Sequence, residues 1–218
     1  MFIGHIAVGF AAKRAAPRVS LGVLIAAASF LDLLWPVFLL LGWERVRIEP
    51  GNTPFTPLAF DSYPISHSLL AALGWSVLCG ILYWAFRRDG RGTGIVAALV
   101  VSHWLLDALS HRPDLPLTPT GSARVGLGLW HSVPATLVVE GAMFAVGVWV
   151  YATFTRAKDR VGRLAFAAYV GTLAVLYLAS VLGPPPPSWR TVAWTALAAI
   201  FFALWPAWFD RHRDFVPH

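Results

Sequence analysis

Long runs of apolar residues, separated by short polar connections, dominate the chain. Six runs are long enough to form membrane-crossing helices: residues 19–43, 63–86, 92–111, 131–154, 164–183 and 191–210. Such a helix needs about 20 apolar residues. A seventh run, residues 2–12, would reach only about 16 Å as a helix and can enter a membrane without crossing it. The pattern predicts an all-α integral membrane protein with about six transmembrane helices and a short N-terminal half-helix.

The composition agrees with this pattern. Hydrophobic residues make up 57% of the 218 residues and charged residues only 13%, whereas soluble domains carry about 25% charged residues. The mean hydropathy is +0.64. Six spans and their loops use nearly the whole length, so we expect residues 1–218 to form a single transmembrane helical domain.

The charged residues in the loops indicate the orientation. Of the 17 Lys and Arg residues, 12 lie on one side of the predicted spans, in residues 11–18, 87–91, 155–163 and 211–218. Cytoplasmic loops are enriched in Lys and Arg, so this side and the C-terminus are predicted to be cytoplasmic. The same topology explains the net charge of +6. We therefore expect membrane lipids, and no nucleic acid, as partners.

Several ionisable residues lie inside the predicted spans, where each costs free energy unless it is paired or hydrated. They are Asp32, His67, His103, Asp107, His111 and Glu140. His103, Asp107 and His111 are spaced four residues apart, which places all three on one helix face. Counting helical rise from the span ends puts the six residues in the outer half of the membrane. The pattern predicts one polar cavity that opens away from the cytoplasm.

Histidine and carboxylate side chains are ligands for zinc, iron and manganese. We expect a divalent metal ion, with zinc as the first candidate. Its expected ligands are His67, His103, Asp107 and His111. Asp32 and Glu140 are the candidate catalytic residues, since a carboxylate beside a metal-bound water can act as a general base. Two further histidines, His5 in the half-helix and His131 at a span start, are open between ligand and structural roles.

Polar residues near the outer mouth suggest an anionic substrate. The helices predicted to begin at residues 63 and 131 direct their N-termini outward, where free amides favour a negative charge. Arg112 and Arg124, in the outer loop, are candidates to pair with a phosphate or carboxylate, and Ser68 is a further candidate for substrate binding. The alternative for both arginines is to extend from the interface into water.

At these residues the sequence resembles the membrane-bound metal-dependent hydrolase family, which includes the YdjM-like inner-membrane proteins. The matching features are Gly4-His5, Leu31-Asp32, Ser66-His67-Ser68, and Ser102-His103 followed by Asp107, within residues 1–120. The family's Pro-Asp-x-Asp and His-Arg-Gly-x-Thr-His-Ser elements are only partly present, which argues against a two-metal site. The resemblance implies a bacterial or archaeal inner membrane, a metal site and hydrolysis.

The leading hypothesis is a hydrolase that acts at the outer leaflet on a lipid or polyprenyl phosphate. A close variant is a single-zinc lipid amidase of the ceramidase type. Three hypotheses from other classes stay open: a metal or proton transporter, in which the polar residues line a pathway, a haem protein with His67 and His103 as axial ligands, and a non-catalytic scaffold with buried polar contacts. The sequence leaves the oligomeric state open.

Overall fold

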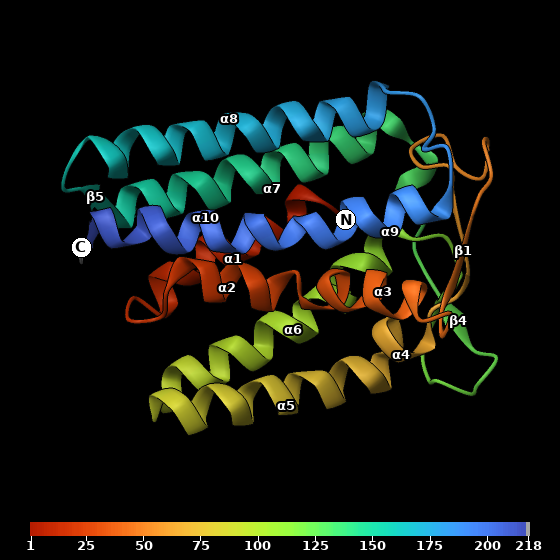
Figure 1. Cartoon of the computed structure of the whole chain (residues 1–218), viewed down its shortest axis with the longest axis horizontal. Coiled ribbons are helices and arrows are strands. Elements are labelled where there is room, and N and C mark those ends of the chain that lie inside the picture. The colour runs from red at the N-terminus through yellow and green to blue at the C-terminus, as the bar shows by residue number, and fades with distance from the viewer. Residues whose placement is uncertain (217–218) are drawn as a thin grey trace.

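Helices that mostly follow a common long axis make up the molecule (Figure 1). The computed structural model describes residues 1–216. The helices in this part are α1 (Ile3–Ala15), α2 (Leu21–Ala28), α3 (Phe30–Leu40), α4 (Pro64–His67), α5 (Leu69–Arg87), α6 (Gly90–Ser110), α7 (Val133–Phe154), α8 (Arg160–Leu182), α9 (Trp189–Leu197) and α10 (Phe201–Phe209). Short 3-10 turns, η1 (Leu129–His131), η2 (Ala198–Ile200) and η3 (Asp210–His212), extend or connect them.

The described residues contain five helical segments that are long and apolar enough to cross a membrane. They are α5, α6, α7, α8 and the continuous segment Trp189–His212, which joins α9, η2, α10 and η3. The bent pair of α2 and α3 makes a sixth if it counts as one span. This confirms the predicted all-α fold with five to six spans and the features of a multi-pass membrane protein.

Two of the predicted spans are interrupted in the structure. The first divides at Ser29 into α2 and α3, whose axes differ by 58°. The span predicted from residue 63 begins as the single turn α4, and the extended backbone of Ser68 then separates it from α5. Pro36 lies inside α3 and is not the site of the bend. The two breaks lie next to the polar residues of the predicted cavity.

Three two-stranded antiparallel sheets lie at the two ends of the bundle (Figure 1). At one end β1 (Arg45–Ile48) pairs with β2 (Leu58–Ser62), and β3 (Leu115–Pro116) pairs with β4 (Arg124–Val125). At the other end β5 (Thr155–Ala157) pairs with β6 (Arg213–Phe215). The first two sheets pair the backbone of the loops after α3 and α6, so they form a cover over one end of the helices.

The short helix α1 is buried at the centre of the bundle, where it packs chiefly against α7 and α2. At its start the backbone N–H groups of Phe2 and Gly4 donate to Glu140 Oε2, at 2.9 and 3.2 Å. At its end Lys13 pairs with Asp210 at 2.7 Å. The chain therefore begins about halfway along the long axis, beside α10 in this view (Figure 1). This brings His5 to the depth of the polar residues in α6.

Close backbone packing holds α1 against its neighbours. A Cβ added to Gly147 of α7 would overlap the backbone of Ala7, and one added to Gly9 would lie 2.9 Å from Ile25 Cα. The helices can approach this closely only because these positions carry no side chain. Close packing against α2 and α7 consequently holds α1 in place.

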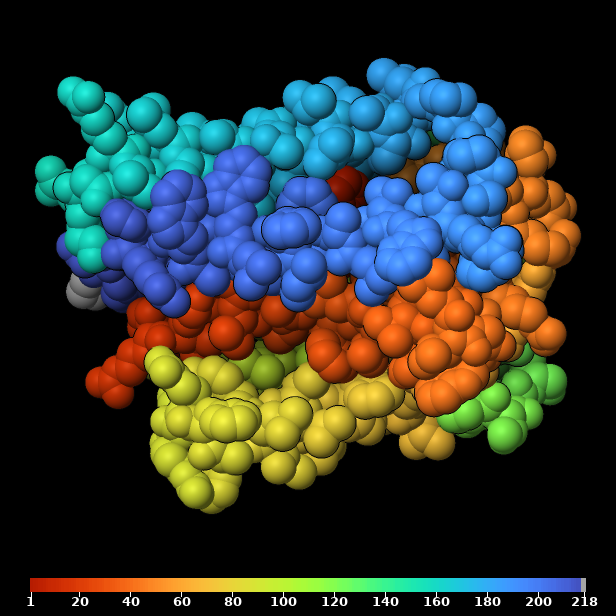
Figure 2. Space-filling view, in the orientation of Figure 1, coloured from red at the N-terminus to blue at the C-terminus, as the bar shows by residue number. Residues whose placement is uncertain are grey.

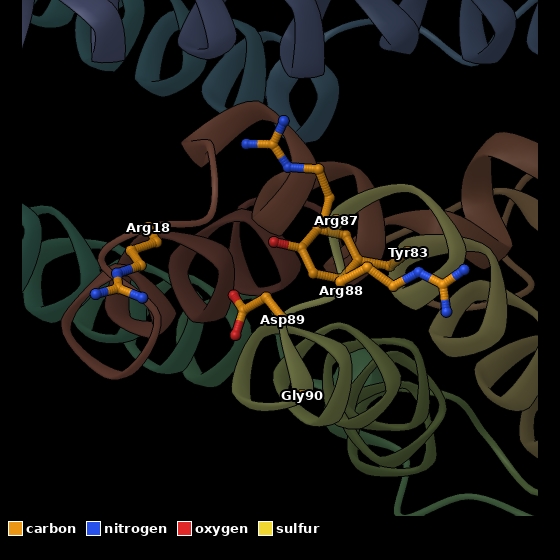
Figure 3. A pocket seen from close by; sticks show the side chains of 6 residues that line it. All are labelled: Arg18, Tyr83, Arg87, Arg88, Asp89 and Gly90. Atoms are coloured by element: carbon orange, nitrogen blue, oxygen red, sulfur yellow. The ribbon is translucent and has the colours of Figure 1, made fainter.

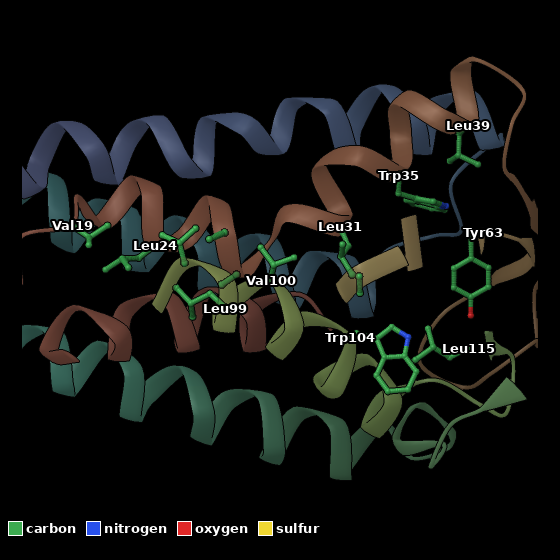
Figure 4. Packing of buried hydrophobic residues seen from close by; sticks show 14 of the residues in the cluster. Val19, Leu24, Leu31, Trp35, Leu39, Tyr63, Leu99, Val100, Trp104 and Leu115 are labelled. Atoms are coloured by element: carbon green, nitrogen blue, oxygen red, sulfur yellow. The ribbon is translucent and has the colours of Figure 1, made fainter. Parts of the chain in front are cut away.

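A buried apolar cluster lies mainly between α2, α3 and α6 (Figure 4). Leu24, Leu31 and Val100 fill its centre, and the Trp104 indole N–H donates to the carbonyl of His67 at 2.9 Å. On the lipid side, by contrast, α5 exposes a row of large apolar side chains at Leu70, Leu73, Val77, Leu78, Ile81 and Phe86. The cluster therefore fixes α4 and α6 relative to each other, which sets the geometry of the site.

Candidate metal centre

Two histidines and two aspartates lie close together beside the break between α2 and α3. Asp32 lies in the first turn of α3, His67 ends α4, and His103 and Asp107 lie one turn apart on α6. His67 Nε2 is 3.5 Å from Asp32 Oδ1 and 3.6 Å from Asp107 Oδ2. His103 Nε2 is 3.7 Å from Asp32 Oδ1 and 3.1 Å from Asp107 Oδ2. The structure thus brings together four residues that the sequence analysis selected.

The four His–Asp separations lie near the value expected for a tetrahedral metal site. Zinc–nitrogen and zinc–oxygen bonds of about 2.0–2.1 Å at tetrahedral angles place the donor atoms about 3.3 Å apart. The measured separations run from 3.1 to 3.7 Å around that value. Asp32, His67 and His103 form one group of donor atoms within 4.8 Å of one another, and His5, His103 and Asp107 form a second. His103 belongs to both groups.

The ring of His67 is oriented by a chain of hydrogen bonds that starts at a buried carboxylate. Ser66 Oγ donates to Glu44 Oε2 at 2.6 Å, so it accepts from His67 Nδ1 at 2.7 Å. Glu44 is held in turn by the N–H groups of Ile65 and Ser66, both at 2.8 Å. This network assigns the proton to Nδ1 and leaves a lone pair on Nε2. Metal-binding histidines are commonly oriented in this way.

The ring of His103 is oriented by the helix break itself. Its Nδ1 lies 2.8 Å from the carbonyl oxygen of Ala28, the last residue of α2. A carbonyl can only accept, so Nδ1 carries the proton, and in the neutral ring that metal binding requires Nε2 carries a lone pair. The same break starts α3 anew, and the positive end of this short helix favours the carboxylate of Asp32 in its first turn. One interruption of the helix thus positions two of the four side chains.

With both rings neutral, the four facing atoms are all electron-pair donors. The ring protons of His67 and His103 lie on Nδ1, away from the facing Nε2 atoms. Within the described part of the chain His103 Nε2 has no hydrogen-bond partner, although Asp107 Oδ2 is only 3.1 Å away. Two carboxylate oxygens and two nitrogen lone pairs at such distances repel each other strongly in a medium of low polarity. A water molecule can donate only two hydrogen bonds, whereas one cation can be shared by all four atoms.

The second oxygen of Asp107 belongs to another set of contacts. Oδ1 accepts from the α-amino group of Met1 at 2.6 Å and lies 3.1 Å from His5 Nε2. The His5 ring stacks on the His103 ring, with centroids 3.7 Å apart and planes 6° apart. His5, which the sequence left open, therefore belongs to the site. It contacts a ligand residue through its ring face and supports the carboxylate of Asp107.

His111, predicted to be a metal ligand, lies in a separate network. Its Nδ1 is 3.0 Å from Asp114 Oδ1 and 3.3 Å from the hydroxyl of Tyr63, and its ring packs on Trp130. Burial raises the pKa of Asp114, but the hydrogen bond from His111 and others outweigh this and hold that pKa below its ordinary value. The structure does not bring His111 to the four donor atoms.

The residues predicted to bind substrate also make their contacts elsewhere. Arg112 Nε donates to Asp114 Oδ2 at 2.9 Å. Arg124 lies on β4 with an exposed side chain. Ser68 Oγ accepts from the N–H of Ala71 at 3.2 Å and so caps the start of α5. The contacts of these three residues therefore support the outer loops and α5.

Glu140 and His131 likewise have structural contacts. Glu140 Oε2 accepts the N–H groups at the start of α1, whereas its Oε1 has no hydrogen-bond partner among the described residues. His131 is exposed, and its Nδ1 lies 3.1 Å from the carbonyl of Gly128. The structure thus gives Glu140 the role of anchoring α1, and through α1 of placing His5.

Two participants were missed by the sequence reasoning. Glu44 follows a predicted span and looks there like an ordinary interfacial carboxylate, yet only about 1% of its surface is exposed. Ser66 was noticed only as part of a motif, whereas its hydroxyl connects Glu44 to His67. The one available signal is the pair Ser66-His67 itself, because a serine beside a buried histidine can orient the ring.

A pocket of about 340 Å³ lies at the end of the molecule opposite to β1–β2 and β3–β4. Arg18, Arg87, Arg88, Tyr83 and Asp89 line it. Figure 3 shows the three guanidinium groups pointing away from one another, and that of Arg88 lies over the Trp84 ring at 4.1 Å. The pocket therefore lacks a convergent set of donors, and its arginines fit the predicted cytoplasmic side.

Comparisons with family models, curated proteins and solved structures find no match to this chain. The functional interpretation therefore depends on the geometry of the site.

Proposed function

We propose that Asp32, His67, His103 and Asp107 bind one zinc ion and that the protein is a metal-dependent hydrolase of the membrane. The observation that carries the proposal is the set of four electron-pair donors, 3.1–3.7 Å apart, that face one another. Nitrogen and carboxylate donors in a tetrahedron are typical of zinc, and manganese or iron are the alternatives.

The four ligands are unequal, and this difference supports a catalytic role. The side chains of His67, His103 and Asp107 are at most 6% exposed, whereas that of Asp32 is 43% exposed. Catalytic zinc sites typically keep three protein ligands and give the fourth position to water, whose pKa falls to about 7 on the metal. We infer that Asp32 is the ligand that yields to water and then acts as the general base for it.

A transporter fits the structure less well. Transport would need polar groups that continue from the site toward the other end of the bundle. Between the site and the Lys13–Asp210 pair near the other end, the buried side chains include the apolar Phe10, Leu24, Leu99 and Val100. A site that ends in an apolar core favours an enzyme. The proposal also includes the family resemblance, an inner-membrane location and a cytoplasmic C-terminus.

Elemental analysis of the purified full-length protein tests the proposal. We expect about one zinc per chain in the wild type and a loss of at least tenfold in occupancy for His103→Ala and for Asp107→Ala, as removal of a ligand implies. His131→Ala is the matched control, because this exposed histidine lies outside the site. Full zinc occupancy in both ligand variants, or no metal in the wild type, would overturn the assignment.

A further inference from the structure

Access to the four donor atoms is limited to one side. His103 has no exposed surface and Asp107 only 2%, so Asp32 offers the one substantial exposed surface among the four ligands. Toward the outer end of the molecule the site is covered by buried aromatic residues, among them Tyr63 and Trp104. A substrate must therefore reach the site past Asp32.

A small pocket leads to Asp32 from the side of the bundle. Its volume is about 40 Å³, and it lies between α1, the α2–α3 break and the η2–α10 segment. Ser29 and Asp32 are its polar lining residues, and the others are Phe2, Ile6, Ile25, Ala26, Leu33, Ala199, Phe202 and Ala203. Because a water needs about 10–15 Å³ of such volume, the pocket holds a reacting group and water but not a whole lipid.

The walls of this pocket depart from regular α-helix on both sides. On one side α2 ends at Ala28 and α3 restarts at Phe30. On the other side the continuous helical segment tightens to the 3-10 turn η2, at Ala198–Ile200. Small side chains at Ala26 and Ala199 line the space between them. The pocket is thus a gap between the helix break and η2, beside Asp32.

The gap faces an apolar exterior. Val23 on α2, Ile200 on η2 and Leu204 on α10 are exposed large apolar side chains of the segments that form the gap. In Figure 2 the first residues of the chain appear as a small dark red area between α8 and the blue α9–α10 segment. Side chains of this kind are in contact with hydrocarbon in a membrane protein. The approach to Asp32 is therefore from the lipid and not from water.

The charge of the pocket limits the chemistry of what enters it. No Lys or Arg is among its lining residues in the described part of the chain. The arginine next to the site in sequence, Arg112, is paired with Asp114. A buried cation at the site, the α-amino group of Met1, is paired with Asp107 Oδ1 and is not among the residues that line the pocket. An uncharged reacting group avoids the large free-energy cost of moving an anion into this environment.

We propose that the substrate is a membrane lipid whose uncharged acyl ester enters sideways between the α2–α3 break and η2, with its hydrocarbon chain along α10. This rests on the proposed hydrolase function and names its substrate class. Water adds its oxygen to the acyl carbon, and the bond from that carbon to the alcohol oxygen breaks. Asp32 takes one proton from the water and passes it to the leaving alcohol. The products are a fatty acid and an alcohol.

The inference can be tested with a probe that does not depend on turnover. The full-length protein is reconstituted in phosphatidylcholine nanodiscs that contain a diacylglycerol with a diazirine on one acyl chain, illuminated, and mapped by mass spectrometry. We expect labelling at residues 199–203 and 29–33. Ala199→Phe, which fills the pocket, should lower this labelling about tenfold, the change expected when about two methylene groups lose their burial. Zinc occupancy should stay unchanged.

The matched control is Ala198→Phe, since Ala198 is the exposed neighbour of Ala199 on η2. It should leave both labelling and zinc occupancy at the wild-type level. Absence of labelling at these residues in the wild type, or equal labelling of the Ala199→Phe variant, overturns the lateral entry while zinc binding stands. Stronger labelling by a phosphatidic acid with the same diazirine chain overturns the uncharged ester. A wild type that is labelled but binds no zinc overturns the hydrolase function instead.

Discussion

The hydrogen bonds that orient His67 give a quantitative prediction for zinc affinity. Ser66→Ala removes the hydroxyl between Glu44 Oε2 and His67 Nδ1, which lies 2.6 and 2.7 Å from them. Both partners are buried, and each unsatisfied polar group costs about 1–3 kcal/mol. The ring of His67 then loses its fixed tautomer and orientation, and loss of such outer contacts weakens metal binding about 10–100-fold. We expect Ser66→Ala to bind zinc more weakly by that factor, while His67→Ala loses more.

Competition of the protein in detergent against a chromophoric zinc chelator measures this affinity directly. Ser68→Ala is the matched control, because Ser68 is equally buried two residues away but its hydroxyl caps α5. Its removal should lower stability by about 1 kcal/mol through the lost cap and leave the zinc affinity unchanged. If Ser66→Ala bound zinc as tightly as the wild type, the chain from Glu44 to His67 would not orient a ligand. Equal weakening in both variants would point to a general loss of fold.

Two further predictions concern the framework of the site. Gly147→Val forces α7 away from α1 and should cost about 1–3 kcal/mol of stability by thermal unfolding, whereas Gly141→Val, which meets open space, should be near neutral. Hydrogen bonds from the Gly162 amide and from His212 lower the pKa of Asp159 below its ordinary value of 3.8. This folded-state pKa lies below the unfolded one, so the stabilisation is present above about pH 4 and is lost as the pH falls through the folded value. Amide hydrogen exchange at the start of α8 should become faster there, after correction for intrinsic rates, and Asp159→Asn should abolish the change; an identical pH profile in both proteins would refute it.

The spans could be predicted from the sequence because lipid imposes a simple rule on length and composition. The interruptions could not be predicted in the same way. The break at Ser29 lies in a run of apolar and small residues without a nearby proline, and the actual proline, Pro36, is accommodated inside α3. Tertiary contacts make the break favourable, because His103 takes the carbonyl of Ala28. Such a contact joins residues that are far apart in the sequence.

The site residues could be predicted where their positions depended on helical spacing. The prediction failed where the helix ended. His103 and Asp107 share a face because α6 is continuous between them. His111 would extend that face by one more turn, but α6 ends at Ser110 and the backbone of His111 is extended. Its ring then pairs with Asp114 in the outer loop. The role of Glu44 could not be predicted, since it depends on the fold of a loop that carries no periodic pattern.

The placement of two carboxylates explains why the site needs both helix breaks and a cation. Asp107 is buried, and Asp32 lies within 3.7 Å of the same histidine nitrogen. The Met1 α-amino group offsets the charge of Asp107 at Oδ1, whereas Oδ2 faces the same histidine as Asp32. In the proposed zinc site, metal binding and the packing of α3 against α6 therefore favour each other. The exposed side of Asp32 lets this one ligand leave the metal without disturbing the three that the core holds in place. A rigid site of three ligands beside one mobile carboxylate can thus bind its metal tightly and still admit water.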